Sequence, residues 1–196
     1  LVADAVSMPV HWYYNRGALD QDYGDFTTYC RPRNPHPDSI LWRSEYSPKN
    51  SKADILGNQL KYWGRRGIHY HQLLEEGDNT LNLQLAAELY RNCILHGGFD
   101  PETWLKRYVE VMLTPGWHRD TYAEEYHRAF FANYSNGKSL FSCGISDYHI
   151  GGLSLIPALL ASMEALDDTD SSDQLEKVLN LVRLTHDHEY TLRAAT

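Results

Sequence analysis

Cysteine is scarce in this chain, and the three cysteines, Cys30, Cys93 and Cys143, lie far apart along it. An odd number at such spacings forms neither a CxxC metal motif nor a self-contained disulfide framework. Thiols without a disulfide pattern are typical of a reducing compartment. We therefore expect an intracellular, cytoplasmic protein.

Two further absences exclude classes of partner. No apolar run approaches the length of about 18 residues that a membrane-spanning helix requires, and no basic segment precedes an apolar one as in a signal peptide. The formal net charge of −8 is spread along the chain rather than gathered in one tail. Because nucleic acids bind clustered Lys and Arg, we expect neither a nucleic-acid nor a membrane partner.

Alternation of apolar and polar residues, the pattern of a strand, is never longer than a few residues, and no internal repeat is visible. Apolar residues recur instead at helical spacing, most clearly at Leu81, Leu85 and Leu89 behind Asp78, which would be the N-cap. This spacing predicts an all-α fold. The predicted helices span residues 78–96, 101–114, 120–134, 152–166 and 174–186, with one more beginning after Asp187.

Capping residues and prolines set the expected limits of these helices. Asp100 with Pro101 is a typical helix start, and Asp120 is expected to cap the third helix. The helix over 152–166 is nearly uniformly apolar, which predicts burial on most sides. Four prolines between residues 15 and 58 predict a long irregular excursion there.

The length of 196 residues and the hydrophobic content of 42% are enough for one domain with a substantial core. The chain begins at Leu1 inside an apolar run and stops without a helix C-cap. We therefore expect a single domain, residues 1–196, that is truncated at both ends.

Four short motifs carry residues suited to chemistry. The first runs from Ala3-Asp4-Ala5 to Pro9-Val10-His11-Trp12, and the second is Gly77-Asp78-Asn79-Thr80 at the head of the strongest predicted helix. The third is Asp147-Tyr148-His149-Ile150-Gly151-Gly152-Leu153, and the fourth is Leu184-Thr185-His186-Asp187. Their order and spacing resemble the ADP-ribosylglycohydrolase superfamily. His11-Trp12-Tyr13-Tyr14, together with the second motif, is most similar to its branch that includes the J crystallins of invertebrate lenses.

The resemblance implies an orthogonal helical domain that hydrolyses the bond between ADP-ribose C1″ and a protein side chain or small leaving group, with two Mg²⁺ ions as cofactor. In the superfamily, one metal cluster supplies a Thr and two Asp, and a second Asp-x-Asp-Ser/Thr cluster follows later in the chain. Here Asp78 matches, but Gly77 and Asn79 replace the other two ligands. The later cluster lies in the missing C-terminal part, and we interpret Asp168-Thr169-Asp170 as a solvated loop.

The resemblance also assigns roles to single residues. Asp78 and Asn79 are the expected metal ligands, with an N-cap role as the alternative for Asp78. Asp4 and His11 are the expected catalytic residues. Asp4 has the alternative of bonding a neighbouring loop, and His11 that of capping or of packing beside Trp12.

The third and fourth motifs supply the expected substrate contacts. His149 and His186 would contact a bound nucleotide, and Gly151 and Gly152 would let the backbone approach a phosphate at a helix N-terminus. Tight helix packing is the alternative for the two glycines. His69 and His71 do not share a helix face, and we take them as loop residues.

Two hypotheses for the function follow. The first is an ADP-ribosylglycohydrolase-like protein with an incomplete metal site, which acts on or binds ADP-ribose or an ADP-ribosylated protein. The second is an inactive structural protein on the same fold, with a protein assembly partner. Counting ligand oxygens, we expect weak or absent Mg²⁺ binding, no ordered metal pair and no detectable ADP-ribosyl hydrolysis.

Overall fold

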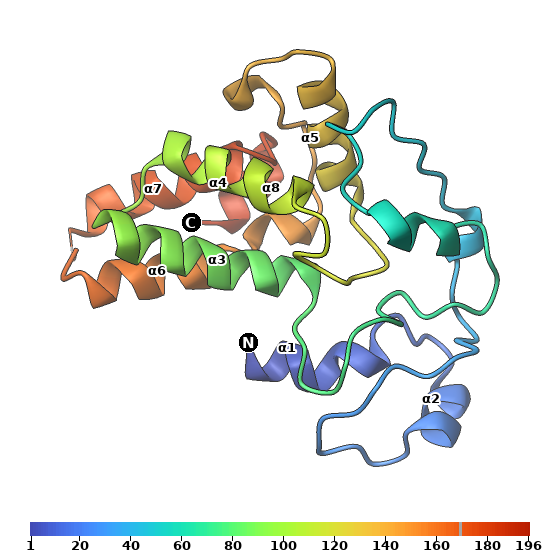
Figure 1. Cartoon of the computed structure of the whole chain (residues 1–196). Helices are drawn as coiled ribbons and strands as arrows, with labels where there is room; N and C mark the ends of the chain where they lie inside the picture. The colour runs from blue at the N-terminus through green and yellow to red at the C-terminus, as the bar shows by residue number, and fades with distance from the viewer. Residues whose placement is uncertain (169) are drawn as a thin grey trace. The chain divides into compact units, whose positions relative to one another are not determined.

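A computed structural model describes residues 1–168 and 170–196, and its regular secondary structure is helical (Figure 1). No strand occurs within these residues, where Ile145 and His186 form an isolated parallel bridge. The all-α prediction is confirmed at this level. No helix in the described part of the chain is both long and apolar enough to cross a membrane.

The described chain divides into two compact units. Unit 1 comprises Leu1–Ser47, Leu56–Leu81 and His118–Ala123, and unit 2 comprises Pro48–Ile55, Asn82–Trp117 and Glu124–Thr196. That residues 1–196 act as a single domain stays a prediction.

Unit 1 contains short helical segments joined by long loops, as the prolines predict. They are α1 (Val2–Ser7), η1 (Met8–Val10), α2 (Arg16–Asp22), η2 (Leu41–Arg43) and η3 (Gly57–Tyr62). Its interior is unusual because histidines accompany the apolar side chains: His36 and His69 are buried as completely as Met8 and Leu41. Neutral imidazoles at these positions need hydrogen-bond partners, because a buried polar group without one is costly.

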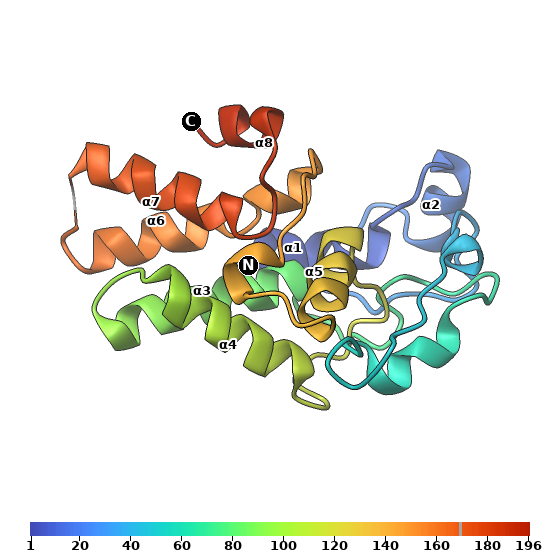
Figure 2. The ribbon, with the colours of Figure 1, turned by 90° about the horizontal axis from the view of Figure 1, so that it is seen from above.

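Unit 2 contains the longer helices. They are α3 (Leu81–His96), whose first residue belongs to unit 1, α4 (Pro101–Leu113), α5 (Glu125–Ser135), η4 (Leu140–Ser142), η5 (Ile150–Leu153), α6 (Ile156–Ala165), α7 (Ser171–Arg183) and α8 (Glu189–Ala194). Helices α3 and α4 lie side by side, as do α6 and α7 (Figures 1 and 2). Leu89, Leu105 and Phe130 are fully buried and form part of the core of this unit.

Four of the five predicted helix starts differ from those in the structure, and two of these were expected to be capped by an aspartate. Helix α3 begins at Leu81, and Asp78 is not its N-cap. The Asp78 carboxylate accepts the Glu75 N–H of the preceding turn instead of an N–H of the helix. Helix α5 begins at Glu125, because Asp120 turns inward and accepts hydrogen bonds inside unit 1. The start at Asp100 and Pro101 is confirmed, since Asp100 Oδ1 accepts the Thr103 N–H at 2.7 Å.

The predicted helix over 152–166 also needs correction. Pro157 lies in the first turn of α6, where a proline without an N–H is tolerated, so the helix begins only at Ile156. It is not buried on most sides: Leu159 and Met163 face the core, whereas Leu160 is 42% exposed. The apolar composition alone could not reveal this exposed face.

Candidate functional site

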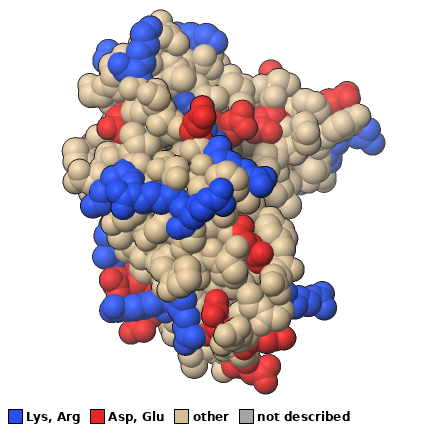
Figure 3. All heavy atoms as spheres, turned by 90° about the vertical axis from the view of Figure 1, so that its right-hand side faces the viewer, with Lys and Arg blue, Asp and Glu red and all other residues tan. Residues whose placement is uncertain are grey.

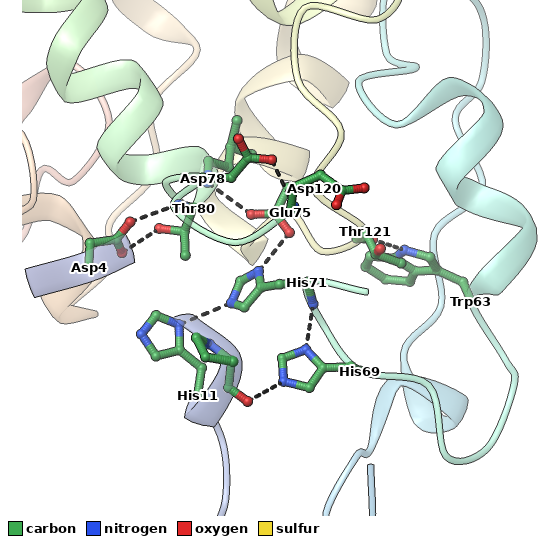
Figure 4. Close-up of polar contacts among 12 residues, drawn as sticks. Asp4, His11, Trp63, His69, His71, Glu75, Asp78, Thr80, Asp120 and Thr121 are labelled. Atoms are coloured by element: carbon green, nitrogen blue, oxygen red, sulfur yellow. Dashed lines mark hydrogen bonds and ion pairs between the residues drawn. The ribbon is translucent and has the colours of Figure 1, made fainter. Parts of the chain in front are cut away.

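Asp4, on α1, is bonded to the second motif (Figure 4). Its Oδ2 accepts the Thr80 N–H at 2.8 Å and the Asn79 side-chain amide at 3.0 Å, and its Oδ1 accepts the Thr80 hydroxyl at 2.8 Å. Asp4 and Thr80 are 76 residues apart in the chain. The structure therefore brings Asp4 and Asn79 together, as the motifs predict.

Asp78 has two partners of its own in unit 1. Its Oδ2 accepts the Glu75 N–H at 2.8 Å and forms an ion pair with the Arg119 guanidinium. Gly77, just before it, has a φ of +89°, a left-handed conformation in which a β-branched side chain is strained. Glycine at this position therefore allows the backbone conformation of the turn, which a threonine would strain.

These contacts test whether the residues present fit a pair of Mg²⁺ ions. Mg²⁺ needs near-octahedral oxygen coordination and usually takes one or two carboxylates. Asp4 already accepts three protein donors, and Arg119 supplies the positive charge at Asp78. Asn79 directs its amide nitrogen, rather than its oxygen, to Asp4 and to the Leu1 carbonyl. In the described residues no group of three or more His, Cys, Asp or Glu is placed to hold a metal, and the residues present do not fit the pair.

A hydrogen-bonded chain of side chains connects α1 to Asp120 in unit 1 (Figure 4). His11 Nε2 lies 3.1 Å from Ser7 Oγ, and His11 Nδ1 lies 3.0 Å from His71 Nε2. His71 Nδ1 lies 2.7 Å from Asp120 Oδ1, while Asp120 Oδ2 accepts the Leu81 N–H at 2.8 Å. We call Ser7, His11, His71 and Asp120 the histidine relay.

The carboxylate at one end fixes the protons of the relay. Burial alone would raise the pKa of Asp120, but the bonds from His71 and from the Leu81 N–H lower it below its usual value, so this acid is ionised at neutral pH. An ionised carboxylate only accepts hydrogen bonds, so His71 carries a proton on Nδ1. The contact between His71 Nε2 and His11 Nδ1 holds one proton, and His11 Nε2 faces Ser7 Oγ, whose hydroxyl donates to the Asp4 carbonyl at 3.2 Å.

His11 is neutral at physiological pH. Burial, followed by the neighbouring His71, lowers its pKa from 6.5 to about 4, although Asp4 and Asp120 act in the opposite direction. A neutral imidazole with a free lone pair accepts a proton from a hydroxyl or a water. The geometry therefore equips His11 for proton transfer and makes simple packing beside Trp12 an incomplete description of its role.

Two more histidines hold the backbone beneath the relay. His69 Nε2 lies 2.9 Å from the Pro9 carbonyl, and His36 Nε2 lies 3.1 Å from the His11 carbonyl. Each Nδ1 accepts a backbone N–H, so each Nε2 is the donor. His69 and His71 do lie in a loop, as predicted, but their structural importance was missed.

The third and fourth motifs meet within unit 2. Gly152 packs against His186, since a Cβ on Gly152 would lie 2.6 Å from His186 Cγ. The Gly151 N–H donates to His149 Nδ1 at 3.1 Å, and the Gly152 N–H donates to the His149 carbonyl at 3.2 Å. Both glycine N–H groups are thus used inside the turn, and these contacts favour the packing role of the glycines over phosphate binding.

His186 is fully buried. Its Nδ1 lies 2.8 Å from Thr185 Oγ1, whereas its Nε2 has no hydrogen-bond partner and lies 3.9 Å from Asp147 Oδ2. Burial lowers the pKa of His186 to about 4, with Asp147 opposing the shift. His149 differs because it is exposed, and a neutral ring that accepts through Nδ1 presents an Nε2–H donor to a ligand.

A small cavity lies beside this turn in unit 2. Its volume is about 10 Å³, which is room for a single water. Tyr126 and His127, which line it, donate to Asn82 Oδ1 at 2.7 and 3.0 Å, respectively. A nucleotide does not fit in this volume, so this cavity is not a nucleotide site.

Asp168 and Asp170 lie outside the helices, as expected, but α7 begins at Ser171 rather than at Gln174, so the predicted loop is shorter than expected. Asp170 caps α7 by accepting the Ser172 N–H at 2.9 Å, and Asp168 pairs with Lys177. Thr169 lies outside the described residues.

The predicted site residues are distributed over both units. Asp4, His11, Asp78 and Asn79 belong to unit 1, whereas His149, Gly151, Gly152 and His186 belong to unit 2. Their assembly into one cleft stays a prediction. Comparisons with protein-family models, curated proteins and solved structures found no match for this chain.

Proposed function

We propose that the chain is an ADP-ribosylglycohydrolase-like protein that has the scaffold of that superfamily without its magnesium-dependent hydrolysis. The contact of Asp4 with Asn79 and Thr80 carries the proposal, because it joins the two motifs on which the resemblance depends. In the same contact, both oxygens of the Asp4 carboxylate accept hydrogen bonds from the protein. One interaction thus supports both the family assignment and the absence of a metal pair.

The ligand in this proposal is ADP-ribose, free or attached to a protein. In unit 2, the exposed His149 offers one hydrogen-bond donor to a phosphate oxygen, and the turn that carries it is held by Gly151 and Gly152. Such a ligand would bind at the surface, because the cavity nearby holds only a water.

The histidine relay favours a second candidate function, hydrolysis that needs no metal. His11 Nε2 would accept a proton from an attacking water that takes the place of Ser7 Oγ, its present neighbour at 3.1 Å. Asp120, acting through His71, would stabilise the positive charge that develops on the relay. A pKa of about 4 makes His11 a weak base, so we expect a slow reaction if it occurs.

Calorimetric titration with ADP-ribose, with and without Mg²⁺, tests the first proposal. We expect binding of similar affinity in both conditions and weaker binding by His149→Gln. His96→Gln is the matched control, because His96 is also an exposed histidine of unit 2. Binding that requires Mg²⁺ would refute the proposal, and absence of any binding would favour a purely structural protein.

A hydrolysis assay on an ADP-ribosylated peptide separates the second candidate from the first. Turnover that survives a metal chelator and is abolished in both His11→Gln and His71→Gln supports the relay. Turnover that the chelator abolishes would contradict both functions. Binding without turnover would exclude the second candidate function and support the first.

A further inference from the structure

One surface of unit 1 combines exposed cations with aromatic rings. We call it the basic patch, and it consists of Trp42, Arg43, Lys61, Tyr62, Arg65 and Arg66. Its two segments are adjacent, since the Gly64 N–H donates to the Leu41 carbonyl at 3.3 Å. Figure 3 shows Lys and Arg side chains lying next to one another on the face that includes this part of the chain.

The charge of the patch contrasts with that of the chain. The chain has a net charge of −8, yet residues 55–74 contain no Asp or Glu. The cations of the patch are all exposed, and none forms an ion pair with a described residue. They are Arg43, Lys61, Arg65 and Arg66. Adjacent like charges repel one another, so this arrangement becomes favourable when an anion binds.

The rings hold the cations in place. The guanidinium carbons of Arg66 and Arg43 lie 3.7 and 4.5 Å from the centroid of the Trp42 ring, close enough for cation–π attraction. Lys61 Nζ lies 5.1 Å from the Tyr62 centroid. A guanidinium stacked on a ring loses less freedom when its N–H edge then binds an oxyanion, so the patch is preorganised.

The backbone beneath the patch is also anchored. Trp63, between Tyr62 and the two arginines, donates from Nε1 to the Thr121 carbonyl at 2.9 Å (Figure 4). Its ring stacks on Tyr122 with a centroid separation of 5.6 Å and an interplanar angle of 10°. The cations therefore project from a fixed support rather than from a free loop.

We infer that the basic patch binds an acidic peptide segment of a protein partner through its Asp and Glu carboxylates. The planar guanidinium matches a carboxylate in bidentate geometry. Single-stranded nucleic acid, by contrast, binds through free aromatic faces, and here cations lie over the rings of Trp42 and Tyr62. A long polyanion would also meet the negative charge of the rest of the chain, whereas a short acidic segment need contact only the patch. This inference does not rest on the proposed function.

Fluorescence anisotropy with a labelled Asp/Glu-rich peptide tests the inference on the full chain. We expect binding that weakens as salt is raised, and a roughly tenfold or greater increase in Kd for the double variant Arg65→Gln/Arg66→Gln. The double variant Lys138→Gln/Arg183→Gln makes the same change in net charge at exposed sites outside the patch and should bind like the parent. Trp42→Leu should also weaken binding, although it changes no charge.

Three results would overturn the inference. The first is no binding at low salt, and the second is an equal loss in the control double variant, which would indicate only net-charge attraction. The third is tighter binding of a single-stranded oligonucleotide or a phosphopeptide of equal charge, which would mark a phosphate-binding surface instead. Circular dichroism of each variant checks that the loss of binding does not reflect loss of structure.

Discussion

His11 and His71 share a hydrogen bond between ring nitrogens, with His11 Nδ1 3.0 Å from His71 Nε2. A charged His11 carries a proton on both ring nitrogens, one in that contact and one on Nε2, the atom that faces Ser7. The added charge would then lie beside a second imidazole in a largely buried part of unit 1. This relationship links the chemistry of the relay to the stability of the fold.

The stability of the protein should fall as pH decreases below about 6.5. Burial lowers the pKa of His11 and His186 to about 4 and that of His69 to about 3. Unfolded histidines titrate near 6.5, so between these values the unfolded chain binds more protons than the folded one. As pH falls through this window, each such histidine lowers the free energy of unfolding by up to about 1.4 kcal/mol per pH unit. Above pH 6.5 its full contribution to stability is present. Urea unfolding at pH 7, 6 and 5 measures the slope.

The variant His69→Gln isolates one contribution to that slope. Its side-chain amide can still donate to the Pro9 carbonyl, but it does not titrate. We expect the slope of unfolding free energy against pH to decrease by the contribution of one histidine. An unaltered slope in His69→Gln would show that His69 is not held neutral in the folded state.

Local patterns predicted which segments are helical, but they placed most helix starts several residues away from the observed ones. Asp100 with Pro101 marks the start of α4, and an N-cap followed by a first-turn proline needs no information from distant residues. Asp120 misled the prediction because it looks like a cap in sequence, while its partners, His71 and the Leu81 N–H, are far away in the chain. A helix start competes with such tertiary contacts, and sequence spacing does not reveal which wins.

In the candidate site, too, contacts within recognisable motifs could be predicted, whereas contacts between distant residues without a motif could not. The contact of Asp4 with Asn79 could be predicted because both belong to recognisable motifs. The relay could not, since His71 and Asp120 carry no motif and are 49 residues apart. The sequence offered only a weak signal for the relay. His69 and His71 lie two residues apart in a loop, and both are buried in the structure. The role of Gly152 was also ambiguous, because a glycine needed for packing and a glycine needed for a phosphate look alike in sequence.

Asp4→Ala should destabilise unit 1 by about 2 kcal/mol. The substitution leaves the N–H and hydroxyl of Thr80, a buried residue, without their acceptor, and an unpaired buried polar group costs about 1–3 kcal/mol. Asp25→Ala removes an exposed acid of the same unit and should be nearly neutral. Denaturant unfolding compares the two, and equal effects would show that the contacts of Asp4 contribute little.

Gly152→Ala should destabilise unit 2 by about 1–3 kcal/mol, the usual cost of overpacking. The new Cβ would lie 2.6 Å from His186 Cγ, and the buried His186 ring has little freedom to move. Gly17→Ala is the matched control: this glycine lies in α2, its φ is not positive, and the nearest atom to a new Cβ is at 3.4 Å. There alanine should be neutral or slightly stabilising. Thermal unfolding distinguishes the two, and a neutral Gly152→Ala would mean that the turn can relax.

The last prediction concerns Mg²⁺ and follows from the partners of Asp78. Adding two oxygen ligands with Gly77→Thr and Asn79→Asp is unsuitable, because Gly77 has a φ of +89° and threonine there would strain the turn. The double variant Asn79→Asp/Arg119→Gln instead adds one carboxylate and removes the cation that pairs with Asp78. It should bind one Mg²⁺ measurably, while the parent binds weakly or not at all, since Mg²⁺ usually takes one or two carboxylates together with waters. Adding Asp78→Ala to the double variant should abolish the gain. Calorimetric titration of the three proteins decides, and tight binding of two ions by the parent would refute the conclusion that its carboxylates serve the fold rather than a metal pair.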